Sequence, residues 1–458
     1  MISDATTEKA SDRWTSFKDL DRESEHAQKI DKVLKTANFV YLCSVAVQAR
    51  YDEDLKSNGI INSQSQRLTC AIDESYFAVG HNNLVFEIVF SDASQWIARV
   101  RLPNDQLNER DLVETSILSE IATIKLIASR TSIPVPKIHS FEVNATNAFG
   151  FRYILMQALP GRHLETGLSR SIQRESWGKV IDQLSNYWHQ LSCLRFDRIG
   201  RLWCGRSVDQ REPTLIPIGG IGGPFLTSLE YFHTLRRSNN QQLIAAHPSD
   251  KEWQTASWIL EQTLPSMIID HYIHGPFPIC HMDFHYNNIL VDDAYNITGI
   301  IDWSDAQTVP LERFTITPEF ATFPGLSAEE NEPTITFRNK FAVALKKRET
   351  TTMTGRVKAS GDLPSSSPSS SMHFISDLIG TPLWEIVYRS TYSYWWRARS
   401  DARLVLKQMY GPNARWEDFV SYYENGPVHQ RKLRTVEVNK EGESYGDSSN
   451  KASHLKRS

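Results

Sequence analysis

Apolar residues recur with two different spacings along the chain, and the change falls near residue 160. Between residues 68 and 156, short apolar runs are separated by polar turns, which is typical of β-strands. After residue 160, apolar side chains return every three or four positions, as on one face of a helix. The pattern therefore predicts a strand-rich first part and a mainly helical second part.

The strand-rich part contains six candidate strands and one helix. The strands are expected at residues 69–72, 76–79, 84–90, 96–102, 138–143 and 151–156. Ile117 and Ile121 lie on one face of a helix expected at residues 112–130. Two prolines follow and end this helix, because proline cannot continue it. We expect a mainly antiparallel sheet with one long helix.

The second part predicts helices at residues 162–198 and 253–269, with a Gly- and Pro-rich loop at 199–224 between them. The apolar face of the first helix comprises Ile181, Leu184, Trp188 and Leu191. A flexible Ser- and Pro-rich insert is expected at residues 358–371, because this composition cannot pack a core. The aromatic residues that follow the insert are expected to be core positions of further helices, not a base-stacking platform.

The two ends of the chain are polar. Residues 1–36 are charged and predict either a solvated helix or a frayed arm. A helix is expected from residue 37, followed by a polar loop at 56–66. Residues 430–458 predict a disordered tail.

A short hairpin is the exception in the helical part. Residues 288–291 and 297–301 are expected as short apolar strands, and the segment between them has the composition of a turn. A turn centred near residue 295 pairs residues whose numbers sum to about 590, since opposite residues are equidistant from the turn. Asn288 and Asp302 are therefore expected side by side at the open end of the hairpin.

The residues around this hairpin carry candidate chemistry. His281, Asp283 and Asn288 form H-x-D-x-x-x-x-N, a spacing that chance would place about 0.04 times in a chain of this composition. Asn288 and Asp302 offer hard oxygen ligands, which suit a magnesium ion also held by phosphates. Asp283 enters the same end and can reach an incoming hydroxyl as a base. The alternative is a structural hairpin, and His281 by itself is typical of a histidine that hydrogen-bonds the loop backbone.

At these residues the chain resembles the aminoglycoside phosphotransferase and choline kinase superfamily, which has the protein-kinase-like fold. The superfamily pattern is H-G-D-x-H-x-x-N, followed by I-D-W/F. It is matched here by His281, Asp283, His285, Asn288 and Asp302. Met282 stands where the pattern has glycine, which affects backbone freedom but not the chemistry. The spacing and the run at residues 278–281 look most like the large fungal branch.

The resemblance covers roughly residues 67–425 and implies an α+β, two-lobed fold. A small antiparallel-sheet N-lobe with the hinge would occupy residues 67–160, and a larger, mainly helical C-lobe residues 161–429. Residues 1–66 would form a helical or flexible N-terminal extension. The resemblance also implies ATP and Mg²⁺ as cofactors.

In this superfamily the loop after the second strand of the sheet covers the nucleotide phosphates. Gly80 and Asn82 lie in that loop, and both residue types tolerate positive φ, so their N–H groups can point at phosphate. Arg99 stands where the superfamily has a lysine, and would hold the α/β-phosphates with Glu120 as its partner. The alternatives are that the loop is an ordinary hairpin turn, that Arg99 is a solvent-facing strand residue and that Glu120 is a solvated helix residue.

The resemblance places the hinge between the lobes at residues 157–161. The backbone there would hydrogen-bond adenine, so the side chains of Gln157 and Ala158 need not be polar. Met156 is expected as a core residue at the back of the adenine pocket.

Composition narrows the functional classes. The 458 residues are 40% hydrophobic, which is enough for two lobes, and a net charge of −4 gives no sign of a nucleic-acid-binding surface. Five cysteines are scattered without C-x-x-C pairs, which indicates a reducing compartment instead of a zinc site or a disulfide framework. The first 36 residues lack a signal-peptide apolar region, and the longest early apolar run is too short to span a bilayer. We expect a cytoplasmic protein that binds neither nucleic acid nor membrane, with protein partners unknown.

Three functions are compatible with these residues. The first is an ATP- and Mg²⁺-dependent phosphotransferase, with Asp283 as base and a hydroxyl of a small molecule as acceptor. The second is a pseudo-kinase that binds nucleotide or acts as a scaffold, suggested by Arg99 and the single glycine of the loop. The third, a protein kinase, is disfavoured because no A-P-E sequence or Ser/Thr activation segment follows Asp302.

Overall fold

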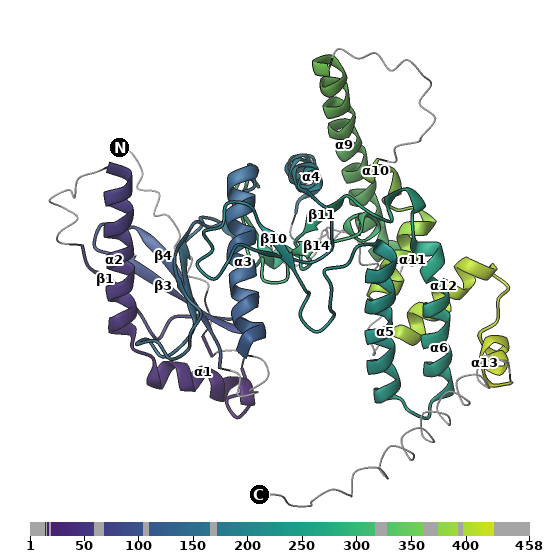
Figure 1. Cartoon of the computed structure of the whole chain (residues 1–458), viewed down its shortest axis with the longest axis horizontal. Helices are drawn as coiled ribbons and strands as arrows, with labels where there is room; N and C mark the ends of the chain where they lie inside the picture. The colour runs from purple at the N-terminus through teal and green to yellow at the C-terminus, as the bar shows by residue number, and fades with distance from the viewer. Residues whose placement is uncertain are drawn as a thin grey trace, which may run out of the picture. The chain divides into compact units, whose positions relative to one another are not determined.

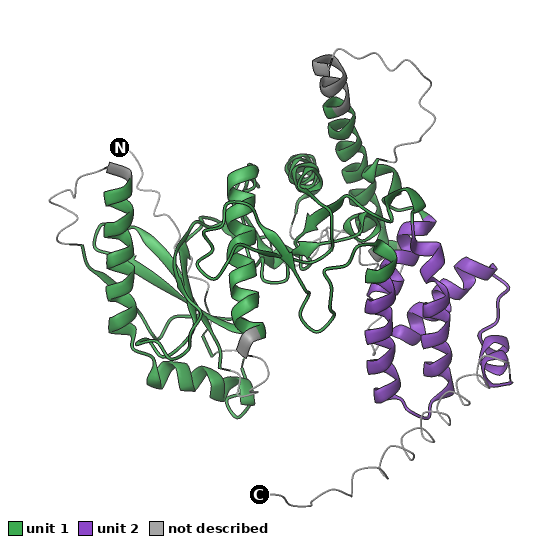
Figure 2. Ribbon diagram, viewed as in Figure 1, with its two compact units in different colours: residues 1–231, 269–381 green, residues 232–268, 382–458 purple. Residues whose placement is uncertain are grey.

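The computed structural model describes residues 14, 16–17, 20–58, 68–103, 110–164, 172–316, 328–360, 374–392 and 397–425. The chain divides into two compact units, shown in Figure 2. Unit 1 comprises residues 1–231 and 269–381, and unit 2 comprises residues 232–268 and 382–458. All residues with a predicted role belong to unit 1. The lobe boundaries expected from the sequence stay a prediction.

A six-stranded antiparallel sheet forms the first part of unit 1. Its order is β1-β3-β4-β6-β5, with β2 beside β3. The strands are β1 (Cys70–Ile72), β2 (Ala78–Val79), β3 (Asn83–Phe90), β4 (Gln95–Arg101), β5 (Ile138–Glu142) and β6 (Tyr153–Gln157). The antiparallel sheet that the apolar pattern predicted is confirmed, and with it the α+β class.

The alternation of side chains along β4 gives the two faces of the sheet different partners. Trp96, Ala98 and Val100 are buried in one core, which α1 (Glu25–Thr36) and α2 (Phe39–Asn58) complete. Because neighbouring strand residues point to opposite faces, Arg99 points away from this core. In Figure 1, α2 and α3 flank the sheet from opposite sides. Arg99 is thereby directed toward α3.

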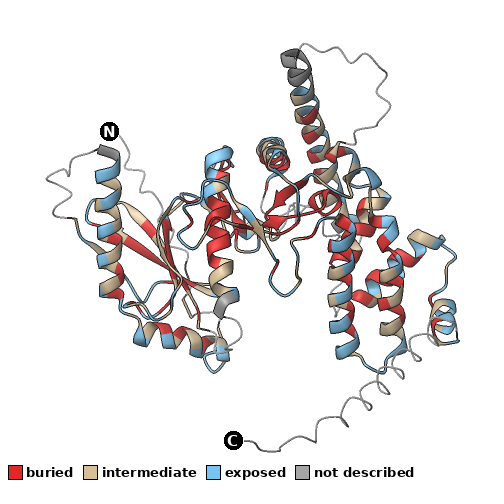
Figure 3. Cartoon of the chain, in the orientation of Figure 1, coloured by how far each residue is buried: buried red, intermediate tan, exposed pale blue. Residues whose placement is uncertain are grey.

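Helix α3 (Arg110–Arg130) confirms the helix expected at residues 112–130, with two more residues at its start. Ile117, Ile121, Ile124 and Ile127 are all buried, as their spacing predicts. Figure 3 shows buried residues, in red, along α3 and along the strands beside it.

For residues 25–36, helix α1 resolves the alternative between a solvated helix and a frayed arm in favour of a helix, but the helix is packed, not solvated. Ser24 caps it, because its hydroxyl accepts a hydrogen bond from the Ala27 N–H at 3.1 Å. Ala27, Ile30 and Val33 are buried at helical spacing. The many charged residues of the segment had hidden this narrow apolar face.

Short strands occur in the second part of unit 1, where the sequence predicted only helices besides the hairpin. They are β7 (Arg162–His163), β8 (Arg195–Phe196), β9 (Arg201–Trp203), β10 (Thr214–Ile216), β11 (Phe277–Cys280), β12 (Ile289–Val291), β13 (Ile297–Ile300) and β14 (Gln307–Thr308). β7 joins the β12–β13 hairpin, β11 lies between β8 and β14, and β9 pairs with β10. Strands of two to four residues are too short to show a two-residue period.

The helices of this part also differ from the expectation. The helix predicted over residues 162–198 is α4 (Trp177–Cys193), preceded by the short 3-10 helix Arg174–Ser176. The further helices are α8 (Leu311–Phe314), α9 (Ala328–Ser360) and α10 (Ile375–Leu378), with 3-10 turns at Asp270–Tyr272 and Tyr286–Asn288. The backbone of α9 is helical to its last residue, so the expected flexible insert begins later than residue 358. The rest of that insert and the expected tail lie outside the described residues.

Unit 2 is helical in the residues described. It contains most of α5 (Ser228–Ala246), then α6 (Lys251–Gln262), α7 (Leu264–Met267), α11 (Pro382–Thr391), α12 (Ala398–Tyr410) and α13 (Trp416–Asn425). The single helix expected at residues 253–269 is divided, because Pro265 lies in the first turn of α7 and cannot donate a backbone bond to α6. Trp384 and Tyr392 are buried, as expected for core aromatics. No helix among the described residues is both long and apolar enough to cross a bilayer.

Candidate active site

The β12–β13 hairpin forms as predicted, but its register differs from the expectation by one residue. The backbone N–H of Ile301 donates to the carbonyl of Asn288 at 3.0 Å, so Asn288 faces Ile301 and not Asp302. The turn is centred earlier than expected, because Val291 faces Ile297 and the centre therefore falls at residue 294. The register shift between Leu290 and Val291 offsets only part of this difference. Asp302 nevertheless follows the same end of the hairpin, one residue further on.

Asp302 adopts a backbone conformation that is uncommon outside glycine, with φ of 61°. Its carboxylate Oδ1 accepts a hydrogen bond from Nη2 of Arg99 at 2.9 Å. The other terminal nitrogen of Arg99 donates to Glu120 of α3. One guanidinium therefore joins the sheet, helix α3 and the residue after the hairpin. The predicted Arg99–Glu120 contact is present, and the link to Asp302 is an addition that spacing alone did not indicate.

This cluster lies largely inside the protein. The side chains of Arg99 and Glu120 are only 12% and 5% exposed, whereas Asp302 is 39% exposed. Burial would lower the pKa of Arg99, but the charges of the two carboxylates outweigh it and raise the pKa. Burial would raise the pKa of Asp302, but Arg99 holds it below its usual value. Burial raises the pKa of Glu120. The Arg99 cation is thus fixed in place, and the more exposed carboxylate, that of Asp302, is ionised.

Arg99 offers a stability prediction. Arg99→Met leaves the buried Glu120 carboxylate without its cation, and we expect a loss of roughly 3–5 kcal/mol in the free energy of unfolding. Arg99→Lys keeps the charge and is expected to lose less. Urea unfolding measures both. Adding Glu120→Gln to Arg99→Met should recover more than half of the loss. Wild-type stability of Arg99→Met would show that the ion pair contributes nothing to folding.

The predicted base lies beside the predicted metal ligand. Nδ2 of Asn288 donates to the backbone carbonyl of Asp283 at 2.9 Å and to its carboxylate Oδ2 at 3.4 Å. Nε2 of His285 lies 3.4 Å from the same Oδ2. The hydrogen bond from His285 lowers the pKa of Asp283, against burial and the charge of Asp302. Asp283 is about half exposed, so an ionised carboxylate faces the accessible side of the loop.

The start of this loop explains two features of the motif. His281 is fully buried, and its Nε2 lies 2.9 Å from the carbonyl oxygen of Ile301, which matches the structural role expected for it. Met282 has φ of 69°, in the left-handed region that favours glycine. The superfamily glycine at this position therefore corresponds to a real backbone requirement, which this chain meets with methionine.

The loop after β2 is a tight hairpin turn. The N–H of Gly80 donates to the carbonyl of Asn83 at 2.9 Å, and the carbonyl of Asn82 accepts from the N–H of Leu102 at 3.0 Å. Asn83, to which the sequence assigned no role, also contacts Arg99: its amide oxygen, when turned toward the guanidinium, accepts from Nε at 3.1 Å and from Nη2 at 2.9 Å. Gly80 and Asn82 thus belong to an ordinary hairpin turn, which was the alternative to a phosphate-binding loop, and this turn contacts Arg99 through Asn83.

The expected hinge follows β6. Met156 is 8% exposed and belongs to the core shared by α3 and α4, as expected. The backbone N–H of Gln157 already donates to the carbonyl of Lys137 at 2.8 Å. Of the two hinge residues with a predicted role, Ala158 is therefore the better candidate for a backbone N–H directed at adenine.

Arg201 of β9 is a further residue at this site that sequence reasoning missed. Its Nη2 donates to the backbone carbonyl of Ser304, two residues after Asp302, and lies 3.3 Å from the hydroxyl of Ser116 on α3. It therefore connects the segment after the hairpin to the helix that carries Glu120. No motif surrounds Arg201, so local sequence contains no signal for this role.

The donor set fits a magnesium ion shared with phosphate. Such an ion uses one or two protein carboxylate or carbonyl oxygens and takes the rest from phosphate and water. The amide nitrogen of Asn288 is engaged with Asp283, so its oxygen is the atom that can ligate a cation. Asp302 supplies a carboxylate. Among the described residues, no group of three or more His, Cys, Asp or Glu side chains is arranged around a common cation position.

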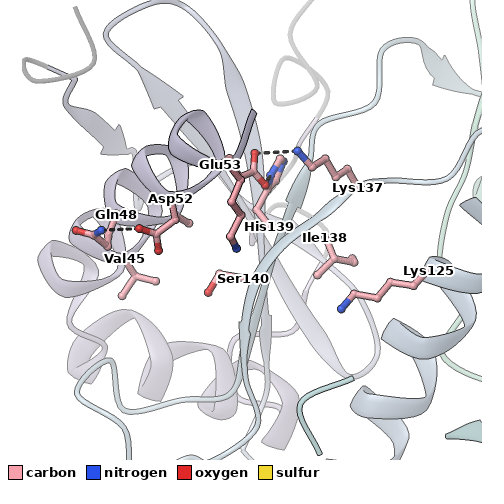
Figure 4. A pocket seen from close by; sticks show the side chains of 11 residues that line it. Val45, Gln48, Asp52, Glu53, Lys125, Lys137, Ile138, His139 and Ser140 are labelled. Carbon is pink, nitrogen blue, oxygen red and sulfur yellow. Dashed lines mark hydrogen bonds and ion pairs between the residues drawn. The ribbon is translucent and has the colours of Figure 1, made fainter. Parts of the chain in front are cut away.

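A cavity of about 540 Å³ lies away from the candidate site in unit 1, among α2, β5 and α3. Figure 4 shows Glu53 of α2 reaching toward the β5 segment, where Lys137 lies 2.9 Å from one carboxylate oxygen and His139 lies 2.8 Å from the other. None of the residues with a predicted role lines this cavity.

The antiparallel sheet, the helix with Glu120 and the H-x-D-x-x-x-x-N loop before a hairpin are the elements that the resemblance to protein-kinase-like phosphotransferases predicted. Residues 74–312, just over half of the chain, match the phosphotransferase enzyme family. The chain belongs to this family.

Two fungal relatives match part of the chain. Altered inheritance of mitochondria protein 9, mitochondrial, from Debaryomyces hansenii is 23% identical over 219 residues, which cover 46% of this chain and 34% of that protein. Clavilactone A biosynthesis cluster protein Y from Ampulloclitocybe clavipes is 27% identical over 246 residues, which cover 48% and 57%. The matches thus span about a third to just over half of the relatives' lengths.

Similar solved structures include the streptomycin–ATP complex of APH(2″)-IIa, with 12% identity and a TM-score of 0.39, covering 67% of this chain and 88% of that chain. Macrolide 2′-phosphotransferase type I aligns with 12% identity and a TM-score of 0.39, covering 76% and 98%.

Proposed function

We propose that the chain transfers the γ-phosphate of ATP, with Mg²⁺, to a hydroxyl group of a small molecule. The observation that carries the proposal is the meeting of four residues at the open end of the hairpin. Asp283 and Asn288 share a hydrogen bond there, and Asp302 is held beside them by Arg99. An ionised carboxylate, two oxygen ligands and an arginine are the parts that phosphoryl transfer requires.

Asp283 is proposed to orient the acceptor and take its proton. Its lowered pKa keeps it ionised near neutral pH, and its half-exposed carboxylate can accept a hydrogen bond from an incoming hydroxyl. Asn288 keeps this carboxylate in place through its amide nitrogen. The acceptor oxygen then forms its bond to the γ-phosphorus, the bond from this phosphorus to the bridging oxygen breaks and ADP leaves. The hydroxyl proton passes to Asp283.

Arg99 is proposed to face the nucleotide phosphates while its partners hold it in position. Its guanidinium is fixed by Glu120 and Asp302, so little side-chain entropy is lost when phosphate binds. When bound, Mg²⁺ would neutralise the negative charge that develops on the phosphate oxygens. Asn288 and Asp302 are the residues proposed to hold it.

A specific contact favours a second candidate, a pseudo-kinase that binds nucleotide or acts as a scaffold without turnover. Asp302, the proposed metal ligand, already accepts a hydrogen bond from Arg99. Because a guanidinium forms a fork, it can neutralise both carboxylates at once and compete with a metal ion for Asp302. A lysine at this position, with one ammonium group, would compete less with the metal ion for Asp302.

Turnover with magnesium and ATP separates the two candidates. The full chain is incubated with γ-labelled ATP, with and without Mg²⁺, and with a panel of hydroxyl-bearing metabolites that includes sugars, amino alcohols and aminoglycosides. We expect Mg²⁺-dependent transfer of label to at least one acceptor, detected by mass spectrometry. Nucleotide binding without transfer to any acceptor would favour the pseudo-kinase.

The location of the protein stays a prediction. We propose a cytoplasmic protein, as the composition suggests, although several similar fungal proteins have a mitochondrial name. Fractionation of cells that express the tagged chain measures this directly, and recovery of the chain with mitochondria would overturn it.

A further inference from the structure

Two of the five cysteines meet in unit 1, although the sequence contains no C-x-x-C pair. Cys43 lies on α2 and Cys70 on β1, 27 positions further along the chain. The thiol of Cys70 donates to the backbone carbonyl of Cys43, with its sulfur 3.4 Å from the oxygen. The two residues therefore lie next to each other, where α2 packs on β1.

The surroundings make the two thiols unequal. Hydrogen bonding from Cys70 lowers the pKa of Cys43, against the effect of burial, and the same contact raises the pKa of Cys70. The thiolate is the nucleophilic form of cysteine, so Cys43 is the better attacking group. Both residues are partly exposed, whereas Cys204 and Cys280 are buried. All five cysteines lie among the described residues and are free thiols.

We propose that Cys43 and Cys70 are a site of reversible disulfide formation that links α2 to the edge strand β1. The oxidant class is a small disulfide such as oxidised glutathione. The Cys43 thiolate attacks one of its sulfurs and releases one glutathione thiolate, which takes up a proton. The Cys70 thiolate then attacks the sulfur of Cys43, closes the protein disulfide and releases the second glutathione. Two electrons pass from the protein to the oxidant, and two protons pass to the released thiolates.

The link would act on the stability of the sheet, not on the proposed catalytic residues. Neither cysteine contacts Asp283, Asn288 or Asp302 in any described interaction. β1 pairs with β3, whose other neighbour β4 carries Arg99. Closing a loop between two distant positions removes conformational freedom from the unfolded chain. We expect the oxidised protein to unfold at a temperature higher by a few degrees, on the order of 5 °C.

The test uses the full chain, purified under reduction and equilibrated with glutathione buffers of increasing oxidised fraction. Thiols are then blocked at acidic pH, and peptides are mapped by mass spectrometry. We expect two of the five thiols to be lost, a cross-linked peptide pair containing Cys43 and Cys70, and full reversal by dithiothreitol. Cys193→Ser, which removes the exposed cysteine, should leave the cross-link unchanged. Cys43→Ser should abolish it.

Several outcomes would overturn the proposal. One is the absence of the cross-link at every ratio of oxidised to reduced glutathione. Another is a glutathione adduct on Cys193 as the main product. A third is a cross-link that forms only in denaturant, which would show that the folded geometry does not permit it. The peptide map of the wild-type protein decides these outcomes even if Cys43→Ser does not fold.

Discussion

Replacing Asp283 by asparagine is expected to lower turnover on the order of 10²–10⁴-fold, the usual contribution of general acid–base help. The exchange keeps the shape of the side chain but removes its charge and its ability to accept the hydroxyl proton. Asn288 and Asp302 are unchanged, so Mg²⁺-ATP should bind with an affinity within a few-fold of wild type. Single-turnover kinetics and calorimetric titration with a non-hydrolysable ATP analogue measure the two quantities separately.

The matched control is Asp293→Asn, which changes an exposed carboxylate in the turn of the same hairpin. It should leave turnover and nucleotide binding as in wild type. Because the pKa of Asp283 lies below its usual value of about 4, its protonation should not limit activity between about pH 5 and 8. Full activity of Asp283→Asn on a verified acceptor would refute the base assignment, whatever the acceptor is.

Asp302→Ala is expected to weaken Mg²⁺-ATP binding and to lower turnover on the order of 10³-fold, since a metal ion stabilises developing charge by several kcal/mol. The change also removes one partner of Arg99, which keeps Glu120. The loss of binding should appear in titrations with Mg²⁺ present and be much smaller with the nucleotide alone. This pattern distinguishes a lost metal ligand from a general loss of the nucleotide site.

Asp305→Ala is the control for this position, because Asp305 is exposed and lies three residues further along the same segment. It should bind and turn over as wild type does. If Asp302→Ala instead binds nucleotide as well with Mg²⁺ as without it, and as tightly as wild type, Asp302 serves only as the partner of Arg99. The pseudo-kinase would then be the better description of the protein.

Local patterns in the sequence predicted the sheet and helix α3 because their main elements are long enough to show a period. They predicted the hairpin because a segment of turn composition separates two apolar runs. The hairpin register was wrong by one residue, since the composition of a turn does not locate its centre to within one residue. The strands β8 and β9 were missed because two or three residues cannot show alternation. Short elements of this kind are defined by their partners elsewhere in the chain.

The candidate site also contains some contacts that could be predicted from the sequence and others that could not. The contact between Arg99 and Glu120 could be expected from the resemblance, because both residues stand at recognised positions. The contact between Arg99 and Asp302 joins residues 203 positions apart, and a lysine at position 99 could not have made the same fork. Arg201 and Asn83 act through neighbours that only the folded chain brings close. The assigned roles themselves await the variants described above.

The packing of α1 and α2 on the sheet determines where this protein can be shortened. Ile30, Val33 and Leu42 complete the core that contains Phe86 and Trp96. A chain starting at residue 74, where the family match begins, would leave this apolar face open to water. Exposed apolar surfaces of this kind cause aggregation. Recombinant versions should therefore keep the first two helices, because the folding unit begins well before the residues that match the family.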